Sequence, residues 1–409
     1  MIGHIRVLDL TDERGLLCGR LLADLGADVV QVEPAAGSSA RSVPPVAATG
    51  SSMFWETFAA NKRGVGLDLD SEQGCATVRA LARRADVVVT SMPADWLRER
   101  GLDPEALRAD DPGLIYTVIS AFGWTGPKAG YADSDLVVWA AGGPLDPHRD
   151  GDRPPLRISV PQAFLHASAD AAAGAMLAVL ARGSTGRGQV VDVSAQASLG
   201  VATLARVLAH AVGDARPEWH RRPVAGGDKS GSGAATPNRL KKWRCRDGMV
   251  ELHLSMGPAS GDFTNRLFTW LHSEGAVSGR IAAWDWKAVP ELIAEGELTG
   301  GDLDEARAAV GSFLATRTKS QVLEAAMEHR LLCMAIFDVA DVCASRHLEE
   351  RGYWAHVHID GVPVRIPGAI AQVGGDGRPG VRRGAPRIGE HTEEVVGDWL
   401  AGAGAEAAS

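Results

Sequence analysis

Short apolar runs alternate with segments of helical spacing along the first 120 residues. Runs of this kind, typical of buried strands, occur at 5–10, 27–32, 65–69, 87–90 and 114–120. Between the first two runs, leucines recur at helical spacing up to Gly26, which can end a helix. A strand, a helix and a strand within about thirty residues form a unit with parallel strands. The pattern therefore predicts an α/β fold whose large domain is Rossmann-like and built on a parallel sheet.

The longest apolar segment covers residues 158–182. Its pattern predicts a short strand, then Pro161 in the first turn of a helix, and then a helix that is apolar on most sides and therefore buried. Gln162, His166 and Asp170 interrupt the apolar run, so we do not expect this helix to span a membrane. No other run is long and pure enough to be a membrane span. A strand at 189–193 and a helix over 194–212 are predicted to follow.

The rest of the chain predicts a smaller α+β domain. Residues 213–237 are rich in Gly, Arg, Pro and Ser, as in a linker or loop. A hairpin with an Asp-Gly turn is predicted over 243–252, followed by four helices near 262–272, 287–295, 302–315 and 319–330. The pattern then returns to strands and turns and ends in a short helix. We therefore predict a large domain at 1–212, a linker at 213–237, a small domain at 238–340, and a C-terminal segment at 341–409 that returns to the large domain.

Composition and charge narrow the function classes. The formal net charge of −9 argues against a nucleic-acid-binding protein, which usually carries a basic field. The five cysteines are far apart and form no CxxC pair, so neither a disulfide framework nor a metal site is predicted. After the first strand, Asp12-Glu-Arg-Gly15 stands where a dinucleotide-binding fingerprint would need glycines, so NAD is not expected. No signal peptide opens the sequence, and we expect a cytoplasmic protein with reduced thiols.

Six segments in order resemble the class III CoA-transferase family, which includes formyl-CoA and carnitine CoA-transferases and a branch of α-methylacyl-CoA racemases. They are Leu21–Val29 with Glu33-Pro34, Asn61–Arg63 followed by Leu67–Leu69, Ser120–Pro127, Thr185–Ser194, Arg351-Gly352 and Ala385–His391. The resemblance implies a Rossmann-like large domain, a small domain and an interlocked dimer of two chains. It also implies coenzyme A thioesters and small carboxylic acids as substrates, without a metal.

The resemblance also implies a nucleophilic aspartate at the start of the long helix, which attacks the acyl-CoA thioester and forms a mixed anhydride. Counted back from Thr185, that position is Phe164, which cannot form the anhydride. The nearest alternatives, His166 and Asp170, lie roughly 200° and 240° further round a helix. The racemase branch pairs the aspartate with a histidine, and that position here is Ser134, beside Asp135. Racemisation, which needs two positioned bases, is therefore the less favoured activity.

The expected contacts with coenzyme A also depart from the family pattern. Asp70 stands where the family often has a lysine, and the sequence at 90–95 replaces a family loop that carries an arginine. Loss of these cations weakens charge-assisted contacts with phosphates. The remaining candidates for binding coenzyme A are Arg41, Lys62, Arg63 and Ser134, and the three cations could equally serve the fold.

Three hypotheses follow for the function. The favoured one is the non-catalytic subunit of a hetero-oligomeric CoA-transferase, whose homologous partner supplies the aspartate. The second is a repurposed acyl-CoA enzyme, an isomerase, hydratase or lyase, that uses His166, Asp135 or Asp170. The third is a homodimeric acyl-CoA-binding protein without catalysis. The sequence does not name the acyl group or the acceptor acid.

Overall fold

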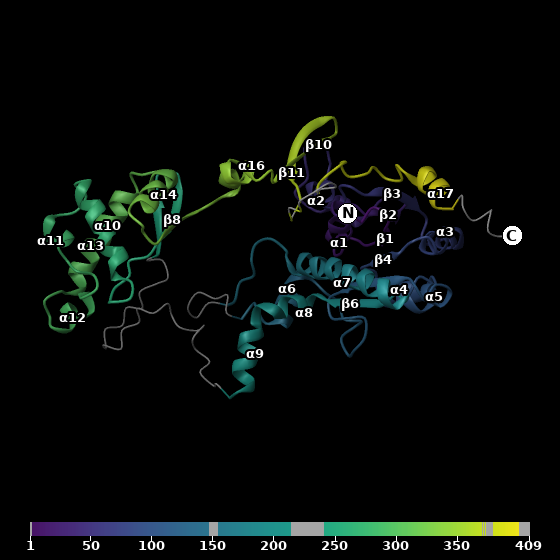
Figure 1. The fold of residues 1–409 in the computed structure, drawn as a ribbon, viewed down its shortest axis with the longest axis horizontal. Helices are drawn as coiled ribbons and strands as arrows, with labels where there is room; N and C mark the ends of the chain where they lie inside the picture. The colour runs from purple at the N-terminus through teal and green to yellow at the C-terminus, as the bar shows by residue number, and fades with distance from the viewer. Residues whose placement is uncertain are drawn as a thin grey trace. The chain divides into compact units, whose positions relative to one another are not determined.

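A computed structural model describes residues 2–146, 154–213, 241–369, 371, 373 and 379–400 (Figure 1). The chain divides into two compact units. The first consists of residues 1–216 and 347–409, and the second consists of residues 217–346. The predicted linker at 213–237 lies, except for Gly213, outside the described residues.

A six-stranded, wholly parallel sheet forms the centre of the first unit. Its strand order is β3-β2-β1-β4-β5-β6, which is the order of a doubly wound dinucleotide-binding fold. The strands are β1 (Arg6–Leu10), β2 (Asp28–Pro34), β3 (Arg63–Leu67), β4 (Val87–Thr90), β5 (Ile115–Ser120) and β6 (Val190–Ser194). The prediction of a Rossmann-like parallel sheet is confirmed.

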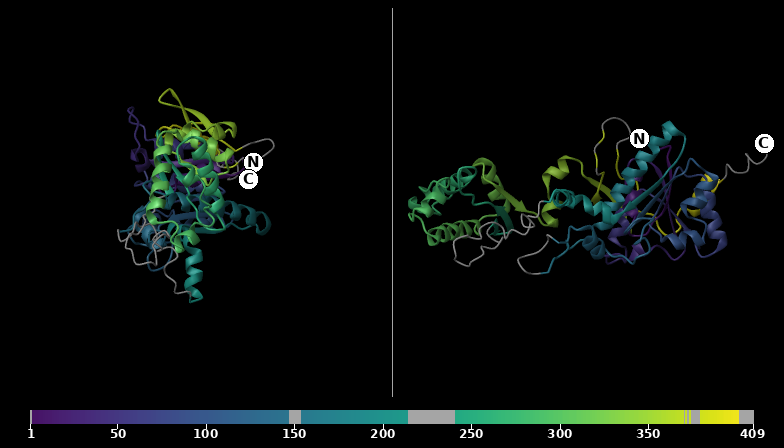
Figure 2. Two further views of the ribbon diagram at one scale, coloured as in Figure 1. Left: turned by 90° about the vertical axis from the view of Figure 1, so that its left-hand side faces the viewer. Right: turned by 90° about the horizontal axis from the view of Figure 1, so that it is seen from below.

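Helices cover both faces of this sheet (Figure 2). Successive strand residues point to opposite faces, so Val7 belongs to one core cluster and Leu8 to the other. The first face is covered by α1 (Leu16–Asp24), α6 (Asp135–Gly142), α7 (Ala163–Thr185) and α8 (Ala195–Gly200). The second face is covered by α3 (Glu72–Ala82), α4 (Ala94–Glu99), α5 (Pro104–Asp110) and α17 (Thr392–Leu400). The remaining helices of this part are η1 (Ser39–Ser42), α2 (Met53–Phe58), η2 (Val201–Thr203) and α9 (Leu204–Ala211).

The long helix α7 packs on the sheet through an alanine face. Its buried side chains are Ala163, Ala167, Ser168, Ala171, Ala172, Ala175 and Ala178. Leu177 and Leu180 on the other side are 67% and 74% exposed in the single chain, so the prediction of burial on most sides was wrong. Among the described residues, α7 is also the one helix long and apolar enough, by length and composition, to cross a membrane.

The start of α7 differs from the prediction. The helix begins at Ala163 rather than Pro161, and the described residues 154–162 contain no strand. The physical reason is a carboxylate from another element. Asp135 accepts hydrogen bonds from the backbone amides of Gln162 and Ala163, so the helix begins where this carboxylate satisfies its first free amides.

The C-terminal segment returns to the first unit. After α16 (Arg346–Glu350), strands β10 (Trp354–Ile359) and β11 (Val362–Pro367) form an antiparallel hairpin. The helix α17 then packs Val395 and Trp399 into the core of the second sheet face. Arg63 on β3 holds this helix through ion pairs with Glu394 and Asp398.

The second unit is built around a three-stranded antiparallel sheet in the order β7-β8-β9. Strands β7 (Lys242–Cys245), β8 (Gly248–Leu252) and β9 (Cys333–Ile336) lie against a helical core with Phe268 stacked on Trp286. The helices are α10 (Gly261–Ser273), α11 (Gly279–Ala282), α12 (Val289–Ala294), α13 (Gly300–Leu314), α14 (Lys319–Glu328) and α15 (Val339–Cys343). The predicted hairpin and the four predicted helices are confirmed. Strand β9 was not predicted.

Candidate functional site

A cavity of about 470 Å³ lies at the N-terminal end of α7, and its wall belongs wholly to the first unit. The loop after β1, the segment 43–45, helix α2 and the start of α7 contribute to the wall. The lining residues are Glu13, Arg14, Val43, Pro44, Pro45, Met53, Phe54, Thr57, Phe58, Asp135, Val160, Pro161, Phe164 and Leu165. Ten of these fourteen are apolar, and the volume lies within the range of about 300–1,000 Å³ found for small-molecule sites.

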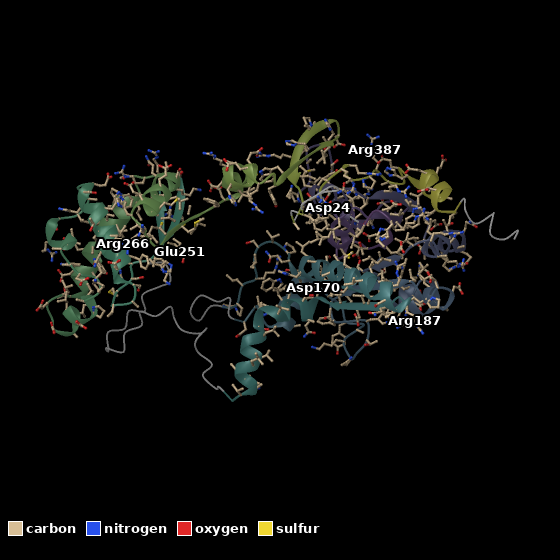
Figure 3. All side chains as sticks on the ribbon, in the orientation of Figure 1. Asp24, Asp170, Arg187, Glu251, Arg266 and Arg387 are labelled. Atoms are coloured by element: carbon tan, nitrogen blue, oxygen red, sulfur yellow. The ribbon has the colours of Figure 1, made fainter. Side chains whose placement is uncertain are left out.

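Phe164 lines this cavity from the first turn of α7. Its ring is partly buried and packs against the core of the first sheet face. Ala163 and Ala167 on the same helix are buried against the sheet. Their burial fixes the rotation of the helix, so the side chain at position 164 faces the cavity. The two other candidates on this helix lie elsewhere. His166 and Asp170 are exposed, neither lines the cavity, and Asp170 lies further along α7 (Figure 3).

Asp135 lies in the cavity wall and holds the start of α7. Its Oδ1 atom accepts hydrogen bonds from the backbone amides of Gln162 at 2.7 Å and Ala163 at 2.8 Å. Its Oδ2 atom lies 3.3 Å from a guanidinium nitrogen of Arg157. The carboxylate therefore satisfies the free amides of a helix N-terminus, where negative charge is favoured. Both oxygens of Asp135 already have partners.

Ser134 has a local structural role in this conformation. It is the N-cap of α6, and its hydroxyl accepts a hydrogen bond from the backbone amide of Val137. An N-cap serine followed by an acidic residue is a common helix start, which explains why Ser134 and Asp135 occur together.

Arg14 is the cation in the cavity wall, and it is fully paired. Its guanidinium bonds to both carboxylate oxygens of Asp12 and lies 3.3 Å from an oxygen of Asp133. Burial alone would lower the pKa of Arg14, but the hydrogen bonds and charge of Asp12 outweigh burial and raise it. Arg14 is therefore a fixed cation whose charge is already compensated.

Lys62 lies beneath the surface with its side chain 0% exposed. Its ammonium group donates to Asp9, to the carbonyl of Leu16 and to the side-chain oxygen of Gln31, at 2.8–2.9 Å. Complete burial lowers the pKa of Lys62, and the bond to Asp9 opposes that shift. All three amine hydrogens are engaged, so the geometry favours a role in the fold over contact with a phosphate.

Arg41 and Arg63 are likewise held by carboxylates. Arg41 makes two bonds of 2.7 Å to Glu33, whose side chain is fully buried, and its guanidinium lies 3.8 Å from the centre of the Trp55 ring. Arg63 bonds to both oxygens of Asp28 as well as to the helix α17. The four candidate coenzyme A residues thus bond to four different groups of the protein. Each stabilises a different local contact.

A second, very small cavity lies at the carboxyl ends of the strands, where the strand order reverses between β1 and β4. Its volume is about 20 Å³, enough for one water molecule. Leu10, Val32, Leu69, Met92, Trp96 and Leu102 form its apolar wall. In open α/β sheets, ligands bind at this reversal point.

Two arginines that follow Trp96 closely in the chain, Arg98 and Arg100, were not among the candidates. Arg100 lies over the ring of Trp96 at 4.3 Å, and Arg98 lies over the ring of Trp124 at 5.2 Å. Arg100 also pairs with Asp70 at 2.6 Å, so a cation lies beside this acid. The signal for these residues was present in the run Trp96-Leu-Arg-Glu-Arg100, a charged aromatic segment that follows a buried strand.

The described residues contain no group of three or more His, Cys, Asp or Glu side chains arranged to hold a metal ion. The five cysteines, Cys18, Cys75, Cys245, Cys333 and Cys343, are all free thiols.

The fold and the sequence define the class of protein. A sequence model of CoA-transferase family III matches residues 3–392, and the chain belongs to this family. It is 31% identical over 408 residues to the succinyl-CoA:(R)-benzylsuccinate CoA-transferase subunit BbsE of Thauera aromatica, a match that covers 96% of this chain and 93% of that protein. It is 38% identical over 194 residues to the succinyl-CoA–D-citramalate CoA-transferase of Chloroflexus aurantiacus, covering 47% of this chain and 48% of that protein. A crystal structure of a CAIB/BAIF family protein from Brucella suis superposes with a TM-score of 0.76 at 25% identity, covering 97% of this chain and 98% of that one.

Membership of this family implies CoA thioesters as substrates. The match of the family model confirms the family assignment made from the six sequence segments.

Proposed function

We propose that this chain is the non-catalytic subunit of a hetero-oligomeric CoA-transferase. A homologous chain would carry the nucleophilic aspartate, and the complex would move coenzyme A between small carboxylic acids. The observation that carries the proposal is the position of Phe164. Its ring faces the cavity at the start of α7, where the family resemblance places the carboxylate.

The surroundings of Phe164 support this proposal. A substitute nucleophile would need a carboxylate that is exposed to the cavity and free to attack. Asp135 lines the cavity, but its two oxygens are engaged by the α7 amides and by Arg157. Glu13, the other carboxylate in the wall, is hydrogen-bonded to Ser39. The chemistry is therefore assigned to the partner, whose aspartate would attack the thioester carbonyl, release CoA thiolate and form the mixed anhydride.

Apolar surface outside the cavity supports assembly with a second chain. Leu177 and Leu180 on α7 are joined by further exposed side chains, Val190 on β6 and Leu204, Val207 and Leu208 on α9. Helix α7 packs beside β6, and exposed apolar surface that is contiguous marks interaction sites in soluble proteins. We propose that these elements lie in the interface of an interlocked dimer, formed with the homologous subunit or with a second copy. The free thiols fit a cytoplasmic complex.

The name of one relative points in the same direction. BbsE is itself described as a subunit of a CoA-transferase that uses succinyl-CoA and (R)-benzylsuccinate. This likeness extends over nearly the whole of both chains, which supports a two-chain enzyme here as well.

The repurposed-enzyme hypothesis has weaker support. His166 and Asp170 are exposed and lie outside the cavity wall, and Asp135 is fully bonded. An enzyme built on these residues would need them to converge on one reacting atom. The homodimeric binding protein remains as the outcome if no partner is found.

Co-expression with the most similar aspartate-bearing homologue from the same source tests the proposal. We expect the two chains to co-purify by size exclusion and the complex to transfer CoA, while either chain expressed alone has little or no activity. If the chains never co-purify and this chain alone converts an acyl-CoA, the proposal fails. Loss of that activity in His166→Ala, or in an Asp135→Ala variant whose fold is shown to be intact, would then support the repurposed enzyme.

A further inference from the structure

The wall of the 470 Å³ cavity has two chemically different parts. One part is aromatic and apolar. Phe54 and Phe58 meet edge to face with ring centres 4.7 Å apart, and Phe164 and Met53 also line the cavity. Aromatic rings and methionine sulphur both form favourable contacts with a further aromatic ring.

The other part carries charged side chains that already have polar partners. Arg14 is bonded to Asp12 and Asp133, Asp135 is bonded to the α7 amides, and Glu13 is bonded to Ser39. The three charged lining residues are one cation and two anions, so their formal sum is −1. A free carboxylate placed here would find no unpaired cation and would be repelled by the net charge.

We infer that this cavity binds the neutral aryl end of an acyl group, presented as a thioester rather than as the free acid. The inference rests on the proposed function for the source of the acyl group, but the site itself is complete within this chain. A phenyl ring with a short chain fits within the volume, and three phenylalanines and a methionine supply the contacts. The position at which the family resemblance places the nucleophile has thereby become part of a binding surface.

The local structure supports a preformed site. Helix α2 is fixed by its N-cap Ser52 and by the fully packed Trp55, whose indole N–H donates to the carbonyl of Pro386. Asp135 fixes the start of α7 on the opposite side. The two aromatic walls therefore stand on anchored elements, and little conformational entropy needs to be lost when a ring enters.

The test uses the full purified chain and three small probes. The probes are 3-phenylpropanamide, its carboxylate analogue 3-phenylpropanoate, and the polar diamide succinamide. Isothermal titration calorimetry and saturation-transfer NMR measure binding. We expect the neutral phenyl probe to bind, the phenyl carboxylate to bind roughly tenfold more weakly or not at all, and succinamide not to bind. Equal binding of the two phenyl probes would contradict the charge argument, and absence of binding by all three would contradict the site.

Two substitutions locate the binding. Val160→Trp adds an indole at an exposed position in the wall and should reduce the affinity for 3-phenylpropanamide by roughly tenfold or more. Phe54→Leu removes one ring while keeping an apolar wall and should weaken binding in the same direction. Val362→Trp, an exposed position on β11 outside the wall, is the matched control and should leave the affinity unchanged. If Val160→Trp and Phe54→Leu both bind as the unaltered chain does, the probe lies elsewhere and the inference is wrong.

The binding test can fail without contradicting the proposed function. Binding is measured on this chain alone, so it does not depend on a partner. A complex that forms and transfers CoA while this chain fails to bind the phenyl probe would remove the aryl site and leave the proposed function intact.

Discussion

The Asp135 carboxylate accepts a 2.8 Å hydrogen bond from the backbone amide of Ala163, the residue immediately before Phe164. A side chain from α6 thus fixes the first turn of α7, and with it the direction of Phe164. The start of α7 is defined by this tertiary contact, because no side-chain cap within α7 itself holds it.

Asp135→Ala should lower the free energy of unfolding by about 1–2 kcal/mol, because two helix amides lose their acceptor. Urea denaturation measures the change. Asp170→Ala, an exposed acid on the same helix, is the control and should change stability by less than about 0.5 kcal/mol. Equal effects of the two substitutions would show that the Asp135 cap does not stabilise the fold.

Lys62→Met should destabilise the protein strongly, by about 3–5 kcal/mol, because it leaves Asp9 buried without its cation. Lys287→Met removes an exposed lysine and should be near neutral. Thermal and urea unfolding measure both. A Lys62 variant that keeps its stability but loses affinity for coenzyme A would instead identify Lys62 as a ligand-binding residue.

Arg63→Gln should loosen the C-terminal helix from the sheet. Arg63 joins Asp28 on β2 to Glu394 and Asp398 on α17, so its loss removes the two ion pairs that it makes to that helix. Hydrogen exchange should become faster in Thr392–Leu400 than in the central strands. Arg83→Gln, which breaks an exposed pair with Asp110, should leave exchange in α17 unchanged. Unchanged exchange in α17 of the Arg63 variant would contradict the attachment.

Cys333 should react slowly with alkylating agents. Burial raises the pKa of its thiol to about 12, and the nearby Cys245 adds to the shift. The reactive thiolate appears only as the pH rises towards that value, so at pH 8 only on the order of one molecule in ten thousand carries it. Iodoacetamide labelling followed by peptide mass spectrometry should show the exposed Cys343 modified well before Cys333. Labelling of both at similar rates would contradict the shift.

Much of the fold was predictable because the apolar pattern reports it locally. The strands of the large sheet before Ser120 are short buried runs, and the Asp247-Gly248 pair marks the hairpin of the second unit. The start of α7 was not predictable, since its amides bond to Asp135, which lies 28 residues before Ala163 in the chain. Residues of α2 were missed as cavity wall for the same reason. Their place beside Phe164 depends on tertiary packing that spacing does not encode.

The candidate cations show the same limit. Lys62, Arg63 and Arg41 stood out by resemblance, but the acids that hold them lie elsewhere in the chain, Asp9 in β1 and Asp28 and Glu33 in β2. Sequence alone left open whether these cations face a ligand or the fold. The pairing of strands β1, β2 and β3 brings Asp9 and Asp28 to Lys62 and Arg63. Arg41 reaches Glu33 from the short helix η1, which follows β2.

Phe164→Asp tests whether the rest of the site is intact. If the rest of the site is intact, the new carboxylate should give measurable transferase activity, although it enters beside Asp135 and a net negative wall. Phe164→Asn has the same size without a nucleophile and should stay inactive. Activity in both variants would mean that position 164 is not where the chemistry occurs.

The most direct test of the account is to find which chain becomes covalently modified. The mixed complex is supplied with an acyl-CoA, quenched with hydroxylamine, and both chains are weighed by intact-protein mass spectrometry. The account predicts a hydroxamate on the aspartate of the homologous partner and an unmodified mass for this chain. An acyl, CoA or hydroxamate adduct on this chain would contradict it, and the position of the adduct would identify the nucleophile.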